Sequence, residues 1–443
     1  MTRLLRIPEG GGSRIVKSAL VAALVLGYAR SDAQYATVDI DTLTVRRATE
    51  LAVAYHPSVR GAEAGVRSAT GAYRQAFSAY LPSLSFNASD THNEGVFVFT
   101  PTSGTRNQIY STYAASFSAQ QTVFDFGRTI GRVSASSNLV DASTMDEVAN
   151  RNSLMMNVEI AYFTVMQTVR VVRVNEEAVD AAQRHLTQAR AFYSVGRRPQ
   201  LDVTKAEVDL ANANVNLIRA RNALQVARVQ LENTIGVRLL PSVVLPDTFA
   251  VYAVSPRLDS LRSEALRRRP ELLAAHARMG ASSALITAAW TQHLPVLSAT
   301  GSYNWSNFET SPLYPRWVAG LTLSLPIFQG FAIDAQVQQA EANEEIARAA
   351  LDQLTQSVLL EVEQNYLSLE EAQERLAATV KLVEQAEQAL VLAERQYAAG
   401  VGTQLDVTDA QLTRSNARIT NIQALFDLNS SLVRLNRSVG LMP

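Results

Sequence analysis

The chain of 443 residues is 47% hydrophobic and 18% charged, which is the composition of a folded protein and not of a disordered one. Its formal net charge of -1 and its 5 scattered histidines provide no basic surface, so we expect no nucleic-acid partner. The chain contains no cysteine, which excludes disulfides, thiolate metal sites and a lipid attached to an N-terminal cysteine.

The first segment has the pattern of an export signal. Basic residues precede the apolar run Ala19–Leu26, and Ser31, Asp32 and Ala33 form a small-x-small cleavage site. We therefore predict a signal peptide at residues 1–33 and a mature chain that begins near Gln34. An uncleaved membrane anchor is the alternative, but the apolar run is shorter than the ~20 residues that a membrane-spanning helix needs.

Two segments of the first half alternate between apolar and polar residues. The apolar series are Leu84, Phe86 and Ala88, and then Tyr113, Ala115, Phe117 and Ala119. A period of two predicts β-strands, here about ten residues long, with one apolar face and one small, polar face.

A long helical pattern follows these strands. Apolar residues recur at steps of three and four from Leu154 to Tyr193, and the absence of proline predicts a helix of about 69 residues over Asp125–Tyr193. A further helix is predicted to start near Pro199. A helix of this length cannot bury its apolar stripe in a compact domain, so it needs long antiparallel neighbours. A coiled-coil rod is the alternative that the helical pattern alone leaves open.

The second half repeats the first. The string QLDVT occurs at Gln200–Thr204 and again at Gln404–Thr408, 204 residues later, and the same offset relates Tyr193 to Tyr397. Upstream the offset is 213, so the first copy carries nine extra residues between its strand signals, for which we expect an exposed loop. We predict a first repeat at 34–240, a linker at 241–256 and a second repeat at 257–443.

The strands are clearer in the second copy. Leu297–Ser306 alternates strictly between apolar and polar residues, and Trp317–Leu325 does so on one face. A soluble, half-buried hairpin would show the same period, but two hairpins at matched positions of an exported chain favour membrane strands. No later segment is long enough for a membrane helix, so a membrane location requires strands and points to a bacterial outer membrane. Four strands cannot close a barrel, so several chains would share one.

The order of these elements resembles the TolC family of outer-membrane efflux channels. The resemblance covers nearly all of the mature chain and is carried by the duplicated helix–hairpin–helix plan, by the Leu-Pro pairs at Leu81 and Leu294, and by the tips YSVGRRPQLDVTKAE and YAAGVGTQLDVTDAQ. It implies a mainly α-helical homotrimer with a membrane β-barrel of twelve strands in outer-membrane lipid and a helical tunnel in the periplasm. It also implies two partners, a periplasmic adaptor protein at the far end of the tunnel and an inner-membrane pump.

Each copy of QLDVT marks the start of a helix. Gly196 and Gly400 are predicted to end the preceding helices, because glycine readily adopts the left-handed C-cap conformation. Pro199 suits the first turn of the next helix, and Thr403 with Asp406 resembles a capping box. The resemblance implies that these turns face the adaptor. The predicted docking residues are therefore Val195, Gly196, Gly400, Val401 and Gly402.

Asp406 and Asp409 are three residues apart and therefore share a helix face. The resemblance places that face at the constriction of the tunnel, where six carboxylates of a trimer would attract cations. Asp409 stands where the first copy has Lys205, so the repeat alone does not require it. The alternative for Asp202 and Asp406 is a helix-start carboxylate favoured by the helix dipole.

In the family that this chain resembles, polar links between helix pairs help to hold the tip closed. Tyr397 and Asp202 occupy the matching positions for one such link. Gly402 stands where we would expect an arginine, and Arg197 or Arg198 is the candidate to replace it. The alternative for both arginines is a solvated loop charge.

The sequence therefore predicts a passive outer-membrane exit duct of a tripartite efflux or type I secretion system. A periplasmic coiled-coil adaptor or scaffold is the alternative, although it would ordinarily have one hairpin flanked by compact β domains. No nucleotide-binding glycine loop, His-x-x-x-His pair or nucleophile elbow is present, so we predict no enzyme activity and no cofactor or metal. We interpret the pair Met155-Met156 as packing.

Overall fold

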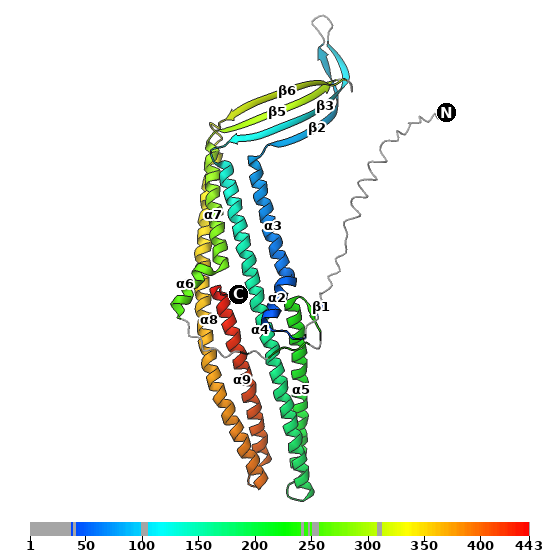
Figure 1. Cartoon of the computed structure of the whole chain (residues 1–443), viewed down its shortest axis with the longest axis vertical. Coiled ribbons are helices and arrows are strands. Elements are labelled where there is room, and N and C mark those ends of the chain that lie inside the picture. The colour runs from blue at the N-terminus through cyan, green and yellow to red at the C-terminus, as the bar shows by residue number, and fades with distance from the viewer. Residues whose placement is uncertain are drawn as a thin grey trace, which may run out of the picture.

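The structure is a computed structural model that describes residues 37–38, 41–98, 105–240, 243–246, 249, 257–307 and 312–442. The predicted signal peptide at 1–33 lies outside these ranges, as does most of the predicted linker at 241–256. Long helices run along the molecule, with a β-sheet at one end and two helix tips at the other (Figure 1). None of the helices in the described ranges is long and apolar enough to cross a lipid bilayer.

Both copies fold into the same series of elements, as the duplicated sequence predicts. The first copy contains α2 (Val45–Tyr55), α3 (Pro57–Phe77), β2 (Ser83–Val98), β3 (Thr105–Phe124), α4 (Arg128–Ser194) and α5 (Gln200–Ile235). The second contains α6 (Leu258–Arg268), α7 (Pro270–Trp290), β5 (Val296–Asn307), β6 (Tyr314–Ser324), α8 (Ala332–Ala399) and α9 (Gln404–Val439). Single 3₁₀ turns, η1 (Ser78–Tyr80) and η2 (Thr291–His293), precede the hairpins, and two short strands, β1 (Thr37–Val38) and β4 (Arg238–Leu239), pair in parallel.

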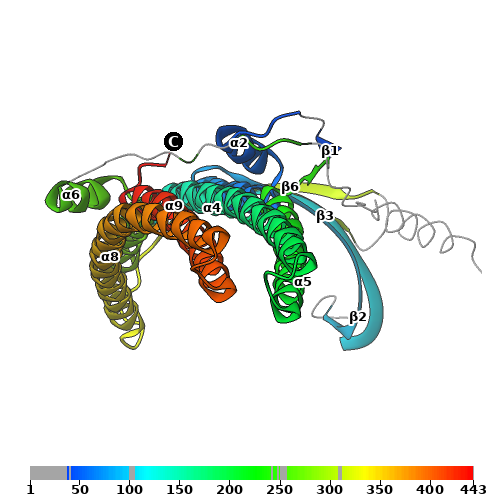
Figure 2. The ribbon, with the colours of Figure 1, turned by 90° about the horizontal axis from the view of Figure 1, so that it is seen from below.

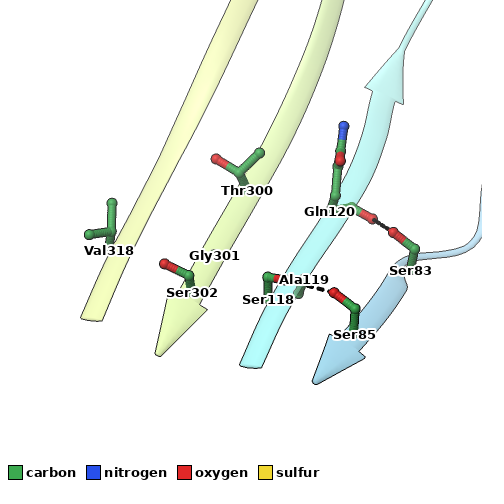
Figure 3. A pocket seen from close by; sticks show the side chains of 9 residues that line it. All are labelled: Ser83, Ser85, Ser118, Ala119, Gln120, Thr300, Gly301, Ser302 and Val318. Atoms are coloured by element: carbon green, nitrogen blue, oxygen red, sulfur yellow. Dashed lines mark hydrogen bonds between the residues drawn. The ribbon is translucent and has the colours of Figure 1, made fainter. Parts of the chain in front are cut away.

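The four long strands form one antiparallel sheet in the order β2-β3-β5-β6. Their register places similar side chains opposite one another in rows that run across the four strands. One row on the first face consists of Phe86, Phe117, Tyr303 and Trp317. A row on the opposite face consists of Ser85, Ser118, Ser302 and Val318, in which the hydroxyls of Ser85 and Ser118 are 2.7 Å apart (Figure 3). The predicted alternation of an apolar and a small, polar face is confirmed in both hairpins.

The first hairpin is longer than predicted. β2 and β3 contain 16 and 20 residues, whereas β5 and β6 contain 12 and 11. At the far end of the first hairpin, Val98 still pairs with Thr105. The extra residues of the first copy extend paired strands, because ladder pairing satisfies backbone groups that a loop would leave to water. This corrects the prediction that they form an exposed loop.

The two longest helices, α4 and α8, contain 67 and 68 residues. α4 begins at Arg128, three residues later than predicted, because Phe126 and Gly127 take positive φ angles of 55° and 101°. A carboxylate oxygen of Asp125 then accepts a hydrogen bond of 2.8 Å from the N–H of Thr129 in the first turn. Most of the predicted apolar stripe of α4 is buried, but Tyr193 at its end is 47% exposed.

Four helices build the end of the molecule opposite the sheet. α5 runs back along α4, and α9 runs back along α8, as the predicted antiparallel neighbours (Figure 1). α9 also packs against α4 and so joins the two copies. Seen from below, these helices form an arc, with α2, β1 and α6 on its convex side (Figure 2).

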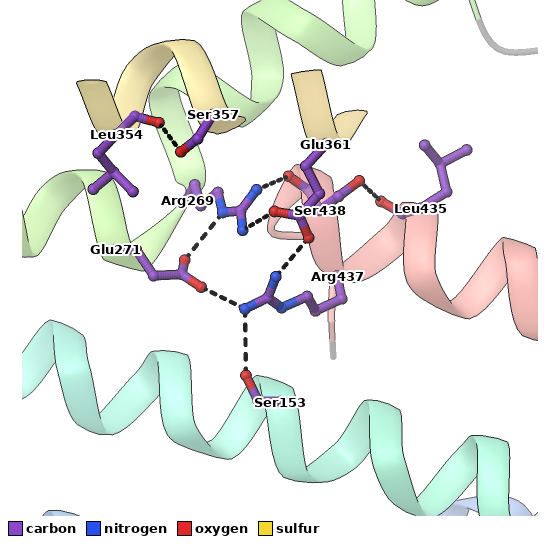
Figure 4. Close-up of polar contacts among 9 residues, drawn as sticks. All are labelled: Ser153, Arg269, Glu271, Leu354, Ser357, Glu361, Leu435, Arg437 and Ser438. Carbon is purple, nitrogen blue, oxygen red and sulfur yellow. Dashed lines mark hydrogen bonds and ion pairs between the residues drawn. The ribbon is translucent and has the colours of Figure 1, made fainter. Parts of the chain in front are cut away.

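A cluster of ion pairs near the middle of the molecule joins the start of α7 to α8 and to the end of α9 (Figure 4). Arg269, which is 4% exposed, pairs with Glu271 and Glu361. Arg437 pairs with the same two glutamates at 2.8 and 2.7 Å. The cluster therefore holds the end of α9 against α7 and α8.

In each copy, the glycine that follows the last helix packs against the residues just before the 21-residue helix of that copy. A Cβ on Gly236 would lie 3.2 Å from the Cα of His56, and a Cβ on Gly440 would lie 3.1 Å from the carbonyl of Arg268. Both glycines have positive φ angles, 82° and 80°. Glycine is therefore required at these two positions both by the space and by the backbone conformation.

Candidate functional site at the helix tips

The two tips share one backbone design. Gly196 follows the C-cap of α4 with a φ of 73°, and Gly400 is the C-cap of α8 with a φ of 81°, so both predicted left-handed glycines are confirmed. The N–H of Gly196 donates to the carbonyl of Tyr193 at 2.9 Å, and that of Gly400 donates to the carbonyl of Tyr397 at 3.1 Å. Each turn then leaves one valine in solvent, Val195 in the first tip and Val401 in the second, with exposures of 68% and 81%.

The helices that leave the tips start differently. Thr403 and Asp406 form the predicted capping box: a carboxylate oxygen of Asp406 accepts from the N–H of Thr403 at 2.8 Å, and the hydroxyl of Thr403 accepts from the N–H of Asp406 at 3.2 Å. Pro199 is the N-cap of α5 with an extended ψ of 157°, so its predicted place in the first helical turn is wrong. The extended ψ is the ordinary conformation of an N-cap, and the carbonyl of Pro199 accepts from the N–H of Asp202 at 3.1 Å. Pro199 makes no side-chain cap bond.

Asp406 and Asp409 lie exposed on the first turns of α9. Hydrogen bonds from the hydroxyl and the N–H of Thr403 lower the pKa of the Asp406 carboxyl. Asp409 makes no hydrogen bond or ion pair within the described ranges. The two carboxylates therefore differ: Asp406 is held by its cap, and Asp409 is available to an ion or another chain.

Tyr397, at the end of α8, is 1% exposed and lies against the first copy. Its ring centroid is 5.3 Å from that of His185 and 6.0 Å from that of Phe192, both in α4, and the guanidinium carbon of Arg198 lies 4.9 Å from it. Its hydroxyl has no hydrogen-bond partner among the described residues. Burial, followed by the charge of Asp202, raises the pKa of Tyr397. Tyr397 and Asp202, which were predicted to form a polar link, are thus close enough to interact electrostatically but are not hydrogen-bonded.

Arg198 joins the two tips directly. Its Nη2 atom donates to the backbone carbonyl of Gly402 at 3.0 Å, and positions 198 and 402 are equivalent in the repeat. A Cβ on Gly402 would lie 3.1 Å from backbone atoms of Gln396 and Tyr397, so a larger residue there would have to displace the end of α8. Arg197 is exposed. Of the two candidate arginines, Arg198 is the one that contacts the second tip.

Further contacts between the copies lie above the tips. Glu177 of α4 pairs with Arg414 and Arg418 of α9, and Arg418 also pairs with Glu387 of α8. The hydroxyl of Thr408 donates to Asp209 of α5 at 3.0 Å. Sequence reasoning missed these ties, although a signal was present: Arg414 and Arg418 replace Leu210 and Asn214 of the first copy, just as Asp409 replaces Lys205.

The site has no metal-binding character in the part of the chain that the structure describes, where no group of three or more histidine and carboxylate side chains could hold an ion. What it offers instead is a set of polar and aromatic ties between two helical hairpins that end side by side. Breaking those ties would let the α8–α9 hairpin move away from the α4–α5 hairpin.

Comparison with known proteins relates this architecture to a family. The family model described as outer membrane efflux protein matches residues 48–237 and 261–441. Outer membrane protein TolC of Escherichia coli is 25% identical over 404 residues, 87% of this chain and 80% of that protein. Outer membrane protein OprJ of Pseudomonas aeruginosa is 26% identical over 405 residues, 89% of this chain and 84% of that protein. The solved structure of the outer-membrane channel OprN has a TM-score of 0.80 at 22% identity, covering 89% of both chains.

Proposed function

Because the chain belongs to the outer membrane efflux protein family, it is an outer-membrane exit duct that reaches into the periplasm, and we propose that three copies build one channel. In this proposal the sheets of the three copies close into one barrel in outer-membrane lipid, and the helices close into one tunnel. The alternative, a periplasmic adaptor, is not favoured, since the family match covers both copies of the repeat.

The four-stranded sheet is the observation that carries the proposal. Its outer strands, β2 and β6, each have one edge that pairs with nothing in the described chain, and β6 is exposed along its whole length. Long strand edges with an apolar face aggregate unless another strand covers them. Cyclic symmetry offers that cover, because β6 of one copy can pair with β2 of the next. Three copies supply twelve strands, and the aromatic rows then face lipid while the serine rows face the channel.

We propose the tips as the gate of the tunnel. Three kinds of contact support a closed arrangement: the bond from Arg198 to the Gly402 carbonyl, the burial of Tyr397 against the first copy, and the ion pairs of Glu177 with Arg414 and Arg418. Asp202, the remaining latch candidate, acts electrostatically on Tyr397 of the other hairpin. Each of these crosses from one hairpin to the other, so an adaptor that separates the hairpins must break them.

The periplasmic adaptor is proposed to dock on the turns themselves, with an inner-membrane pump behind it. Val195 and Val401 are exposed in the turns that follow α4 and α8. These turns lie at the far end from the sheet, so an end-on partner meets them first (Figure 1). Replacing Gly196 or Gly400 with valine should abolish efflux and leave the oligomer intact, because both glycines have positive φ angles that valine disfavours. Gly71, which also has open space but an ordinary helical φ, is the matched control. Full efflux in both tip variants would place docking elsewhere.

Asp406 and Asp409 are proposed as the constriction. Their shared face supports this, since threefold symmetry would gather three copies of each around one axis. Asp406 is part of the capping box of α9 and Asp409 is not, so a substitution of Asp409 tests the constriction apart from the cap. Asp409→Asn should therefore weaken block by hexamminecobalt in planar bilayers without disturbing the capping box. Asp352→Asn, which removes an exposed carboxylate from α8, is the control. Equal block in wild type and Asp409→Asn would remove Asp409 from the constriction.

The assembly itself is tested by mass. Light scattering of the purified protein in detergent should give the mass of three chains, because one copy leaves two strand edges open. A stable monomer with native helical content would contradict the proposed channel.

A further inference from the structure

We propose that His185 is a positioning residue of the gate, which holds Tyr397 in place while its imidazole is neutral and releases it when the imidazole gains a proton. This inference rests on the proposed gate at the tips. The repeat does not require a histidine at this position, because the equivalent residue of the second copy is Ala389.

The geometry places His185 where the two hairpins meet. It lies in α4 and is 6% exposed, and its ring centroid is 5.3 Å from that of Tyr397 in α8. Phe192 and Arg198 contact other parts of the same tyrosine ring. Three side chains of the other hairpin therefore pack on Tyr397, in addition to Ala393 and Val407 of its own hairpin. Of the three, His185 provides the contact farthest from the turn.

His185 and Tyr397 also share a cavity of about 430 Å³ between α4, α8 and α9. The Nε2 atom of His185 and the hydroxyl of Tyr397 both lack a hydrogen-bond partner among the residues that the structure describes. A neutral imidazole tolerates this arrangement at modest cost, whereas an imidazolium with an unpaired N–H is far less stable in a buried site. The contact thus depends on the charge of the ring.

Burial and the neighbouring carboxylates act in opposite directions on the pKa of His185. Burial lowers the pKa of His185, and Asp209, Glu394 and Asp202 act against this shift. Arg184 of α4 and Arg395 of α8 also line the cavity, while α9 contributes the uncharged Val407 and Gln411. The effect of burial exceeds that of the three carboxylates, so the closed tip favours the neutral ring.

The direction of the pH dependence follows from this lowered pKa. When the hairpins part, the ring meets water and its pKa returns toward about 6.5. Above that pH, His185 is neutral in both states and the closed tip keeps its full stability. As the pH falls from about 6.5 toward the lowered pKa, the open state binds a proton that the closed state does not, so opening becomes easier. The open-to-closed ratio can rise by at most about tenfold per pH unit, because one proton per chain is linked.

The absence of native cysteine makes a direct distance measurement possible. Spin labels on Val195→Cys and Val401→Cys, one in each tip, report the separation of the hairpins in trimers diluted with unlabelled chains. In the otherwise native sequence, the population with separated tips should grow as the pH falls from about 7.5 to about 5. The carboxyl of Asp406 stays ionised over this range because its pKa is lowered.

Three variants at position 185 separate charge from packing. His185→Phe keeps a ring against Tyr397 and should stay closed at both pH values, and His185→Ala loses the ring and should be more open at both. His185→Gln should show no pH response. A pH response that survives in His185→Gln, or a native tip that is insensitive to pH, would overturn the proposal.

Arg198→Ala, measured at pH 7.5, distinguishes this failure from a failure of the gate itself. If Arg198→Ala separates the tips but pH does not, only the role of His185 is wrong. If neither Arg198→Ala nor His185→Ala changes the distance, these contacts do not hold the tips, and the proposed gate is wrong as well.

Discussion

Tyr193 and Tyr397 occupy equivalent positions in the last turns of α4 and α8, yet Tyr193 is 47% exposed and Tyr397 is 1% exposed. The backbones around them are alike, with left-handed glycines and the same turn hydrogen bonds. The difference lies in what each tyrosine meets. Tyr397 points into the first copy, and Tyr193 points into solvent. The duplicated backbone thus forms two similar tips that differ in their side chains. The first tip buries Tyr397 of the second, whereas the second tip does not bury Tyr193 of the first.

The same asymmetry runs through the rest of the tips. Arg198 of the first copy donates to the carbonyl of Gly402, its own repeat equivalent. Asp406 is bound in a capping box, whereas α5 starts at Pro199 without a side-chain cap bond. The arginine expected in the second tip is thus found in the first, and the space that it would have filled is occupied by the end of α8.

The middle of the molecule shows the contrast in another form. His56 and Arg269 both precede the proline that starts a 21-residue helix, and both lie against a closing glycine. His56 caps its helix by accepting from the N–H of Ser58 at 3.2 Å. Arg269 enters a cluster with two glutamates. One copy uses a local cap, and the other uses a tertiary ion-pair cluster.

The largest effect should come from breaking this cluster. Arg269→Ala should lower the free energy of unfolding by about 2–3 kcal/mol, less than the 3–5 kcal/mol typical of a buried pair because Arg437 still neutralises both glutamates. His56→Ala should cost about 1 kcal/mol, as for the loss of a helix cap. Denaturant unfolding of the detergent-solubilised protein, followed by circular dichroism, compares the two. Equal losses would mean that the cluster adds nothing beyond a cap.

A smaller effect separates the two helix starts at the tips. Thr403→Ala removes the capping box and should destabilise the first turn of α9 by about 1 kcal/mol. Pro199→Ala removes no side-chain cap bond and should leave the first turn of α5 almost unchanged. Hydrogen exchange of the two turns, read by mass spectrometry, provides the comparison. A larger increase in exchange in α5 on Pro199→Ala than in α9 on Thr403→Ala would show that the caps do not control these ends.

The smallest expected effect is that of low pH on the capping box at the start of α9. The pKa of the Asp406 carboxyl is lowered by its bonds to Thr403, so its contribution is present above the ordinary value of about 3.9 and is lost as the pH falls through the lowered pKa. The first turn of α9 should therefore keep its exchange protection, relative to the middle of the same helix, down to about pH 4. Loss of protection between pH 7 and pH 5 would show that another group controls the cap.

Features that depend on local pattern were predictable from the sequence. The alternation in Leu297–Ser306 predicted a strand with two unlike faces, and the glycines at 196 and 400 predicted left-handed caps, because strand period and φ preference act within a few residues. Thr403 and Asp406 were predictable for the same reason, since a capping box spans one turn. The duplication also predicts that matched segments fold alike.

Features that depend on how the two hairpins meet were not predictable. Which of Arg197 and Arg198 reaches the second tip follows from the rotation of one turn relative to the other, which no pattern in the sequence encodes. The ion pairs of Arg418 with Glu177 and Glu387 join residues more than thirty positions apart on three helices. The start of α4 at Arg128 was not predicted, because the positive φ angles of Phe126 and Gly127 and the bond to Asp125 set it, and not an apolar period.

The central claim is that the closed tip depends on a contact of the first copy with the second, and single-channel recording tests it most directly. Arg198→Ala removes the bond to the Gly402 carbonyl and the cation over the Tyr397 ring, worth together about 1 kcal/mol per chain in a half-exposed site. The resting open probability of reconstituted channels should rise at least about fivefold, which is the factor that 1 kcal/mol gives for a single chain of the trimer. Arg197→Ala, the adjacent and exposed arginine, should leave it unchanged. Equal open probabilities in wild type and both variants would contradict the claim that this contact holds the duct closed.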